Sequence, residues 1–294
     1  MGFGLSSFVF RQPQMINLLQ LAIGFLLSLA IAWLGYRRQS LSPSGALGAV
    51  VLGTVIFGFG GWAWGLLLIA FFVTSSALTH YRRREKATLA EKFAKTGQRD
   101  LWQALANGGW GAVLALLALG AGPTPLLFAA FVGAMATVNA DTWATELGVL
   151  NPRPPRLITT WRPVAVGSSG GVSPLGTAAA TAGALLIALL AWLFLAIGAL
   201  FQAQPLPLAD LRLLPMATLG GLLGSLFDSL LGATVQGIYW CPTCGKETER
   251  QLHTCGTTTR PLRGWRWLNN DWVNFLSSIL GSMITAGLWL LARI

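Results

Sequence analysis

Long stretches of this chain carry no charged residue, and this feature constrains its fold more than any other. With His80 counted as neutral, the charge-free runs cover residues 12–36, 39–81, 101–140, 163–209, 213–227 and 272–292. Charged residues make up only 10% of the chain, whereas a typical soluble domain has roughly 25%. So few charges cannot cover a water-exposed surface of this size. The sequence therefore predicts an integral membrane protein and excludes a soluble enzyme, a disordered chain and a disulfide-stapled secreted domain.

The lengths of these runs predict eight transmembrane helices. About 20 apolar residues cross a bilayer, so a run of roughly 40 residues contains two crossings joined by a turn. The glycine-rich segments 58–61 and 120–123 supply such turns. The expected helices span residues 14–35, 44–60, 62–79, 103–120, 125–148, 175–200, 213–235 and 272–292. We expect an all-α fold with a single transmembrane domain over residues 1–294 and its most elaborate loop at residues 236–271.

Lys and Arg are segregated between the loops that join these helices. Seventeen of the 20 lie in the loops after the first, third, fifth and seventh helices, which share one side of the membrane. Basic loops stay in the cytoplasm, so the sequence predicts both termini outside, in an inner or plasma membrane. This orientation accounts for the net charge of +10, and no loop is large enough for a nucleic-acid-binding domain. Nothing in the sequence predicts an oligomer.

Four of the ten acidic residues lie at expected helix ends on the cytoplasmic side: Asp141, Glu146, Asp228 and Asp271. Carboxylates within a membrane are costly, and they line a polar site or pair with a cation. Each could pair with a loop arginine, but four on one membrane face favour a shared site. On an ideal helix Asp141 and Glu146 would point roughly 140° apart. They therefore need either a local break in the helix or separate roles.

Amide and hydroxyl side chains accompany the carboxylates. Such oxygen ligands suit Mg²⁺, so we interpret the four carboxylates as candidate catalytic and Mg²⁺-binding residues. The neighbouring candidates for substrate binding are Asn139, Thr142, Ser229, Asn270 and Asn274.

A glycine- and serine-rich loop precedes the sixth helix. Ser173 has the character of an N-cap and Pro174 that of a first helical residue. Glycines let backbone N–H groups approach an anion at the positive end of that helix. The candidate phosphate-binding residues are Gly167, Ser168, Ser169, Gly170, Gly171 and Ser173, flanked by Arg156 and Arg162.

The three cysteines lie in the 236–271 loop. Cys241 and Cys244 form a CxxC pair, and His253 and Cys255 could complete a tetrahedral Zn²⁺ site. A cytoplasmic loop disfavours a stable disulfide, and the alternative is three free thiols in a turn. The short spacing between His253 and Cys255 argues against zinc. On balance the pattern favours a small structural zinc knuckle.

Five segments together resemble one family of integral membrane proteins, the phytyl-phosphate kinase family of tocopherol and phylloquinone synthesis with its bacterial relatives. The segments are residues 139–146, 155–161, 166–173, 228–236 and 268–275, and further matches are Gly97, Gln98, Arg99, Gln103 and Asn107. The resemblance runs from about residue 42 to the C-terminus. It implies transfer of a phosphoryl group from a nucleoside triphosphate, with CTP the expected donor, to an isoprenoid monophosphate such as phytyl or geranylgeranyl phosphate.

The candidate residues suit that reaction. A phosphate acceptor is already ionised, so catalysis requires positioning and charge neutralisation rather than a strong base. Arg99 and Lys86, from the basic loop after the third helix, and Asn107 are expected to contact phosphates. Two alternatives stay open: a CTP-dependent cytidylyltransferase that makes a CDP-lipid, and a cation-coupled transporter. A transporter should carry polar groups at the bilayer midplane, whereas here they gather in the cytoplasmic third.

The nucleotide and the prenyl phosphate would meet at the same depth in the membrane, near its cytoplasmic surface. A prenyl chain that leaves the bilayer loses roughly 0.8 kcal/mol of favourable burial per CH₂, whereas nucleotide arrives from the cytosol. We therefore expect one cytoplasm-facing pocket enclosed by the last four helices, with an apolar side opening to the inner leaflet.

Overall fold

The computed structural model describes residues 17–82, 97–122 and 124–292. In this part of the chain, eight helices are long and apolar enough to cross a membrane, which confirms the predicted membrane fold. They are α1 (Leu18–Arg37), α2 (Pro43–Val55) with its π-helical continuation η1 (Ile56–Gly60), α3 (Trp62–His80), α5 (Leu101–Ala121), α6 (Pro125–Gly148), α7 (Pro174–Phe201), α8 (Leu213–Thr234) and α9 (Asn270–Leu291).

Local sequence explains where several of these helices begin. Helices α2, α6 and α7 each start with a proline, and the Ser or Thr before it accepts a hydrogen bond from a backbone N–H of the first turn. Asp100 and Gln103 form a capping box at the start of α5. Ser173 is the N-cap of α7, as the sequence predicted. These caps satisfy backbone donors that have no partner inside the helix.

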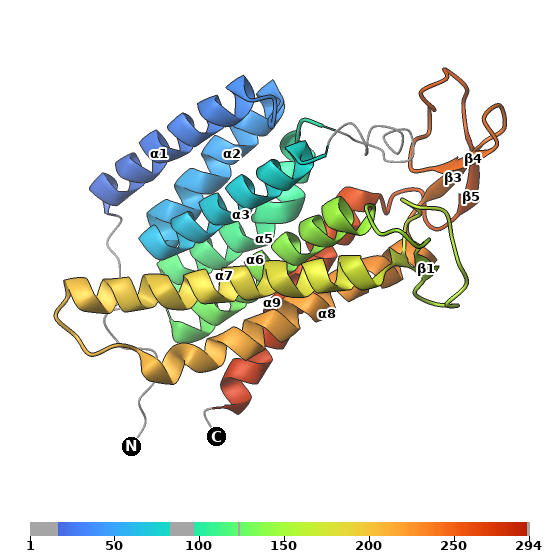
Figure 1. Ribbon diagram of the computed structural model, residues 1–294. Coiled ribbons are helices and arrows are strands. Elements are labelled where there is room, and N and C mark those ends of the chain that lie inside the picture. The colour runs from blue at the N-terminus through green and yellow to red at the C-terminus, as the bar shows by residue number, and fades with distance from the viewer. Residues whose placement is uncertain (1–16, 83–96, 123, 293–294) are drawn as a thin grey trace.

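Helix α6 forms the centre of the molecule. Its thirteen consecutive residues 128–140 are all buried. Helices α7, α8 and α9 pack around it, and α1, α2, η1, α3 and α5 form a second group that meets it mainly through α3 and α5 (Figure 1). Small residues allow the close packing, since a Cβ at Gly133 would lie 2.6 Å from the carbonyl oxygen of Gly281 on α9.

Two small antiparallel sheets lie beyond one end of the helices (Figure 1). Strand β1 (Arg156–Leu157) pairs with β2 (Gly171–Val172) just before α7. Strands β3 (Ile238–Cys241), β4 (Lys246–Thr248) and β5 (Arg260–Arg263) form a sheet in the order β4-β3-β5. The sequence analysis had assigned no strands to these loops.

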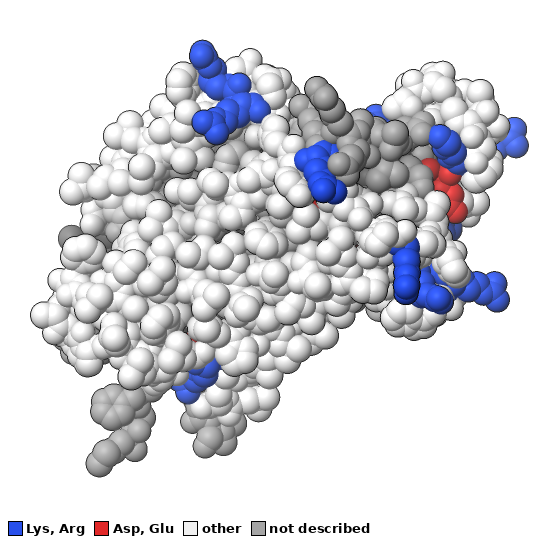
Figure 2. Space-filling model, viewed as in Figure 1, with Lys and Arg blue, Asp and Glu red and all other residues white. Residues whose placement is uncertain are grey.

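Most basic side chains in this view lie around the strands, another cluster lies at the upper ends of α1 and α2, and an uncharged belt covers the rest of the helices (Figure 2). Arg212 marks the opposite end, where it donates a hydrogen bond of 3.1 Å to the carbonyl oxygen of Ala292. The charges are therefore separated along the helix axes, as the loop composition predicted. That the basic end faces the cytoplasm is the expectation of the positive-inside rule.

Candidate active site

A polar cavity of about 550 Å³ lies among the helix ends on the basic side of the molecule. Its walls come from the C-terminal ends of α3, α6 and α8 and from the N-terminal ends of α5, α7 and α9. The glycine- and serine-rich loop before α7 completes it. The structure thus brings together the four helices that the sequence assigned to one pocket and adds α3 and α5.

The four candidate carboxylates all line this cavity. Asp141 accepts a hydrogen bond of 3.4 Å from Ser225 Oγ, and Asp228 accepts one of 3.3 Å from Ser277 Oγ. Ser225 and Asp228 are three residues apart on α8 and therefore share a helix face. Consequently, Asp141 and Asp228 face each other closely enough to interact electrostatically.

Glu146 lies on a different side of the same cavity. Helix α6 is unbroken from Asp141 through Glu146, so the two side chains diverge as an ideal helix requires. Glu146 Oε1 accepts a hydrogen bond of 2.6 Å from Thr79 Oγ1 on α3. Asp141 instead faces α8. The sequence left open either a break in the helix or separate roles for the two carboxylates. In the structure the helix is continuous, and Asp141 and Glu146 lie at separate positions in the cavity.

Arg99 provides positive charge next to Glu146. Its Nη1 donates a hydrogen bond of 3.0 Å to Ser76 Oγ, and its guanidinium carbon lies 6.0 Å from the centre of the Phe72 ring. Burial lowers the pKa of Arg99, and the Glu146 carboxylate opposes this effect. An arginine stays protonated in proteins, so this wall of the cavity carries a half-buried cation.

The loop before α7 is held in place from two sides. Gly170 has a φ of +83°, and a Cβ there would lie 2.6 Å from Cα of Ala233 on α8. Ser169 Oγ donates a hydrogen bond of 2.7 Å to Gln236 Oε1. Only glycine suits both the left-handed conformation and this close approach. The loop therefore has a defined shape at the edge of the cavity.

Further candidates line the cavity as the sequence predicted for one shared pocket. They are Arg99, Asn107, Thr142, Gly167, Ser168, Ser169, Gly170, Gly171, Ser173, Ser229, Asn270 and Asn274. Within the described part of the chain, the buried Oδ1 atom of Asn274 has no hydrogen-bond partner. An unused oxygen in the wall of a polar cavity is a feature of a ligand site.

Three candidates are not brought to the cavity. Asn139 is fully buried; its Nδ2 donates a 2.7 Å hydrogen bond to the Gly183 carbonyl, and its Oδ1 accepts one of 3.1 Å from Thr74 Oγ1. It therefore joins α3, α6 and α7. Arg156 and Arg162 are exposed around the β1 hairpin and line no part of the cavity. Lys86 lies outside the described residues.

Several cavity residues were not predicted as site residues, among them Thr79, Gln103, Ser225 and Glu249. Ser225 lies one helical turn before Asp228, and that spacing was a usable signal. Gln103 had been noted only as part of the family resemblance. Thr79 and Glu249 come from segments far away in the sequence, where nothing local marks them. Glu249 Oε1 accepts a hydrogen bond of 2.9 Å from Gln236 Nε2.

The cysteine-rich loop brings its four candidate ligands together. The ligand atoms of Cys241, Cys244, His253 and Cys255 all lie within 4.8 Å of one another. A turn in which Gly256 N–H donates a 2.9 Å hydrogen bond to the His253 carbonyl folds the last two ligands back. The short spacing between them is therefore no obstacle. This cluster could hold a metal ion such as Zn²⁺.

Comparison with known protein families identifies the family to which the chain belongs. The family described as "Integral membrane protein DUF92" matches residues 26–282. The chain belongs to this family. It is 35% identical to Protein PGR of Arabidopsis thaliana over 280 residues, which are 91% of this chain and 95% of that protein.

Two other relatives are less similar in sequence. An uncharacterized membrane protein of Methanocaldococcus jannaschii is 28% identical over 272 residues, 92% of this chain and 94% of that protein. Protein VTE6, chloroplastic, of Arabidopsis thaliana is 29% identical over 248 residues, 83% of this chain and 64% of that protein. No solved structure matches the chain significantly.

Proposed function

We propose that this DUF92 protein is a membrane-embedded prenyl-phosphate kinase. It transfers a phosphoryl group from a nucleoside triphosphate, with CTP the expected donor, to an isoprenoid monophosphate. One observation carries the proposal: all five segments that resemble the phytyl-phosphate kinase family contribute to the wall of the same polar cavity. These segments are far apart in the sequence, so a shared binding site explains why they meet.

The size of the cavity suits a phosphorylated small molecule. At roughly 30 Å³ per water in the liquid, its volume of about 550 Å³ corresponds to about 18 water molecules.

The residues around the cavity suit phosphoryl transfer. An acceptor phosphate oxygen attacks the γ-phosphorus, the bond from that phosphorus to the β–γ bridging oxygen breaks, and a nucleoside diphosphate leaves. Arg99 and the N–H groups of the loop before α7 would hold phosphate oxygens. Since the acceptor is already ionised, no side chain has to remove a proton.

The donor atoms also fit Mg²⁺. Asp141, Asp228, Asp271 and the unused Asn274 oxygen are the hard oxygen ligands that this ion prefers. They would hold Mg²⁺, which when bound neutralises phosphate charge. Asp141 and Asp228 face each other through Ser225, and a cation between them would relieve the repulsion between the two carboxylates.

The position of the cavity supports a kinase of lipid substrates rather than a transporter. Its carboxylates lie within the last or first two turns of α6, α8 and α9, not at the middle of the helices where transporters bind their cargo. With the basic end in the cytoplasm, nucleotide would enter from the cytosol while a prenyl chain stays in the inner leaflet.

The test is product analysis with the purified protein in lipid nanodiscs, Mg²⁺ and geranylgeranyl monophosphate. With CTP labelled at the γ-phosphate, we expect labelled geranylgeranyl diphosphate and stoichiometric CDP. Pyrophosphate and a CDP-lipid would instead assign a cytidylyltransferase. If neither geranylgeranyl nor phytyl monophosphate is modified with CTP, ATP, GTP or UTP, the proposal is wrong.

A further inference from the structure

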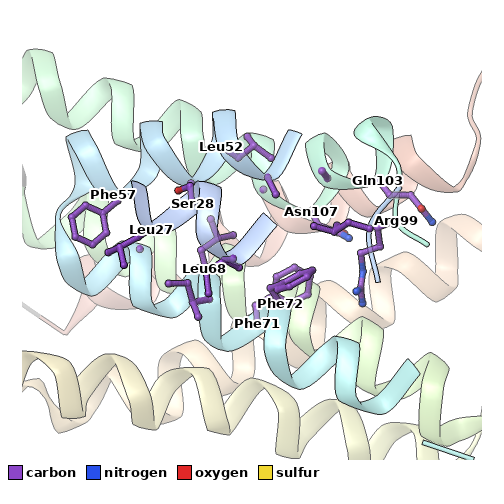
Figure 3. A pocket seen from close by; sticks show the side chains of 18 residues that line it. Leu27, Ser28, Leu52, Phe57, Leu68, Phe71, Phe72, Arg99, Gln103 and Asn107 are labelled. Carbon is purple, nitrogen blue, oxygen red and sulfur yellow. The ribbon is translucent and has the colours of Figure 1, made fainter. Parts of the chain in front are cut away.

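An apolar groove of about 80 Å³ lies among α1, α2, α3 and α5, outside the helices that the sequence had assigned to the pocket. Leu27, Leu52, Phe57, Leu68 and Phe72 are among its lining residues (Figure 3). This groove lies in the first group of helices, whereas the sequence analysis expected an apolar opening among the last four. Sequence could not locate it, because residues that line an apolar groove and residues that face lipid have the same composition.

The polar side chains of this groove lie almost entirely at one end. Apart from Ser28, they are Arg99, Gln103 and Asn107. These three residues also line the polar cavity. Figure 3 shows them together at one end of the groove, with Leu27 and Phe57 at the other. The groove and the cavity therefore meet at a half-buried guanidinium and two amides.

We propose that the groove binds the hydrocarbon chain of the acceptor, with the acceptor's phosphate at Arg99, Gln103 and Asn107. This inference rests on the proposed kinase function and specifies where its lipid substrate lies. A phosphate monoester matches a guanidinium and amide donors, and a hydrocarbon chain attached to it would extend into the apolar groove that adjoins these three residues.

The dimensions of the groove predict which part of the acceptor's hydrocarbon chain the protein recognises. An apolar cavity of about 150 Å³ binds one benzene molecule, so a groove of about 80 Å³ takes roughly three carbons. It would therefore hold part of the first isoprene unit, next to the phosphate. Leu27 is 41% exposed, and it is the one exposed residue of the groove among the described residues. The rest of a longer chain would leave beside α1 and lie in the bilayer.

Small side chains keep the groove open. Ala49, Gly53 and Ala104 line it together with Gly108, where a Cβ would lie 3.0 Å from Cδ1 of Leu52. A larger side chain on this wall would occupy the space of the first isoprene unit. Ala49 on α2 offers such a position, and Val51 on the same helix is 53% exposed and lies outside the groove.

A photolabelling experiment tests the groove without requiring turnover. The wild-type protein in nanodiscs is irradiated with geranyl monophosphate that carries a diazirine at its hydrocarbon end. We expect crosslinks in residues 27–31, 49–57, 65–72 and 104–108, which excess geranylgeranyl monophosphate suppresses. The phosphate-free alcohol with the same diazirine should not label them in a competable way. Labelling elsewhere, such as Leu189 and Leu193 on α7, or no competable labelling, overturns the proposal.

A substitution tests the same groove through activity. We expect Ala49→Phe to lower kcat/KM for geranylgeranyl monophosphate at least tenfold. Val51→Phe should change it less than twofold. If the wild type acts on this substrate and Ala49→Phe leaves kcat/KM unchanged, the groove assignment is wrong. If the wild type does not act on it, the kinase function is wrong, and the photolabelling still decides whether the groove binds an isoprenoid phosphate.

Discussion

At the scale of single residues, the carboxylates of the cavity are held by hydroxyl groups from neighbouring helices. Ser225 and Ser277 donate to Asp141 and Asp228, and Thr79 donates to Glu146. Each bond crosses between helices, so each side chain has a fixed position before any ligand binds. Such preorganisation is what a site for phosphates and metal ions requires.

Substituting Asp141 or Asp228 by Asn tests the role of these carboxylates. The amide retains the size of the side chain but removes the negative charge that would bind Mg²⁺. We expect kinase activity to fall about 100-fold or more, measured across a Mg²⁺ titration, while size-exclusion behaviour stays that of the wild type. Glu247→Gln is the matched control, because Glu247 is exposed on β4 outside the cavity; it should retain activity within about twofold. Normal turnover of both cavity variants would refute the assignment.

Gly170→Ala tests the shape of the loop before α7. The residue has a φ of +83°, which costs an L-residue about 1–2 kcal/mol, and the added Cβ would clash with Ala233. We expect a lower thermal unfolding midpoint and weaker nucleotide binding, measured by a thermal-shift assay and by KM for CTP. Gly120→Ala is the control, since no heavy atom lies within 4 Å of a Cβ there. Equal unfolding midpoints for the two variants would show that the loop is not constrained.

At the scale of structural elements, the sheet of β3, β4 and β5 supports the cavity from outside the helices. Arg263 on β5 donates a 2.6 Å hydrogen bond to the Gly232 carbonyl and one of 3.3 Å to the Ser169 carbonyl. Gln236 just before β3 bonds both Ser169 and Glu249. The cysteine cluster closes the same loop, so a metal there would stabilise an element that contacts the loop before α7.

We expect purified protein to contain about one zinc ion per chain, because three thiolates and one imidazole form a typical structural zinc set. Elemental analysis of the wild type and of Cys241→Ser and Cys244→Ser checks this prediction, and both variants should lose the metal. Thr243→Ala is the matched control: Thr243 lies in the same turn, where its hydroxyl contacts that of Thr257 at 2.9 Å, and it is not a ligand. A metal-free protein that is fully active would exclude the zinc knuckle.

At the scale of the whole molecule, the separation of charge sets the orientation in the membrane. Among the described residues, the basic connections after α1, α6 and α8 lie at the end with the cavity, and Arg212 lies at the other end. Since basic loops are retained in the cytoplasm, the cavity should face the compartment that supplies nucleotide.

Reporter fusions in a bacterial inner membrane test this orientation. Alkaline phosphatase needs disulfides that form only outside the cytoplasm. We expect a fusion at the C-terminus to be active, and a fusion after Arg162, in the loop before α7, to be inactive. Fluorescent protein fusions at the same two positions should show the opposite pattern. The reverse result would place the cavity outside and exclude a cytosolic nucleotide donor.

The positions of the helices can be predicted from the sequence because every residue inside the bilayer meets the same apolar environment. Charged groups are excluded from its interior, so the charge-free runs predict the spans: residues 62–79 and 125–148 correspond to Trp62–His80 and Pro125–Gly148. Caps such as Ser173 are equally local. The convergence of Asp141, Asp228 and Asp271 could also be anticipated, because alternate helix ends must lie on the same side of the membrane.

The direction of each side chain depends on how the helices pack, and no local rule supplies it. Asn139 and Asp141 are two residues apart, yet they point roughly 200° apart on a helix; one joins three helices and the other faces the cavity. Glu249 follows strand β4 and reaches the cavity because the three-stranded sheet, through Arg263, hydrogen-bonds the Gly232 carbonyl of α8. The groove beside Arg99 exists because α1, α2, α3 and α5 leave space between them. In a membrane protein, the residues around that space are as apolar as those that face lipid, so only their packing distinguishes the two.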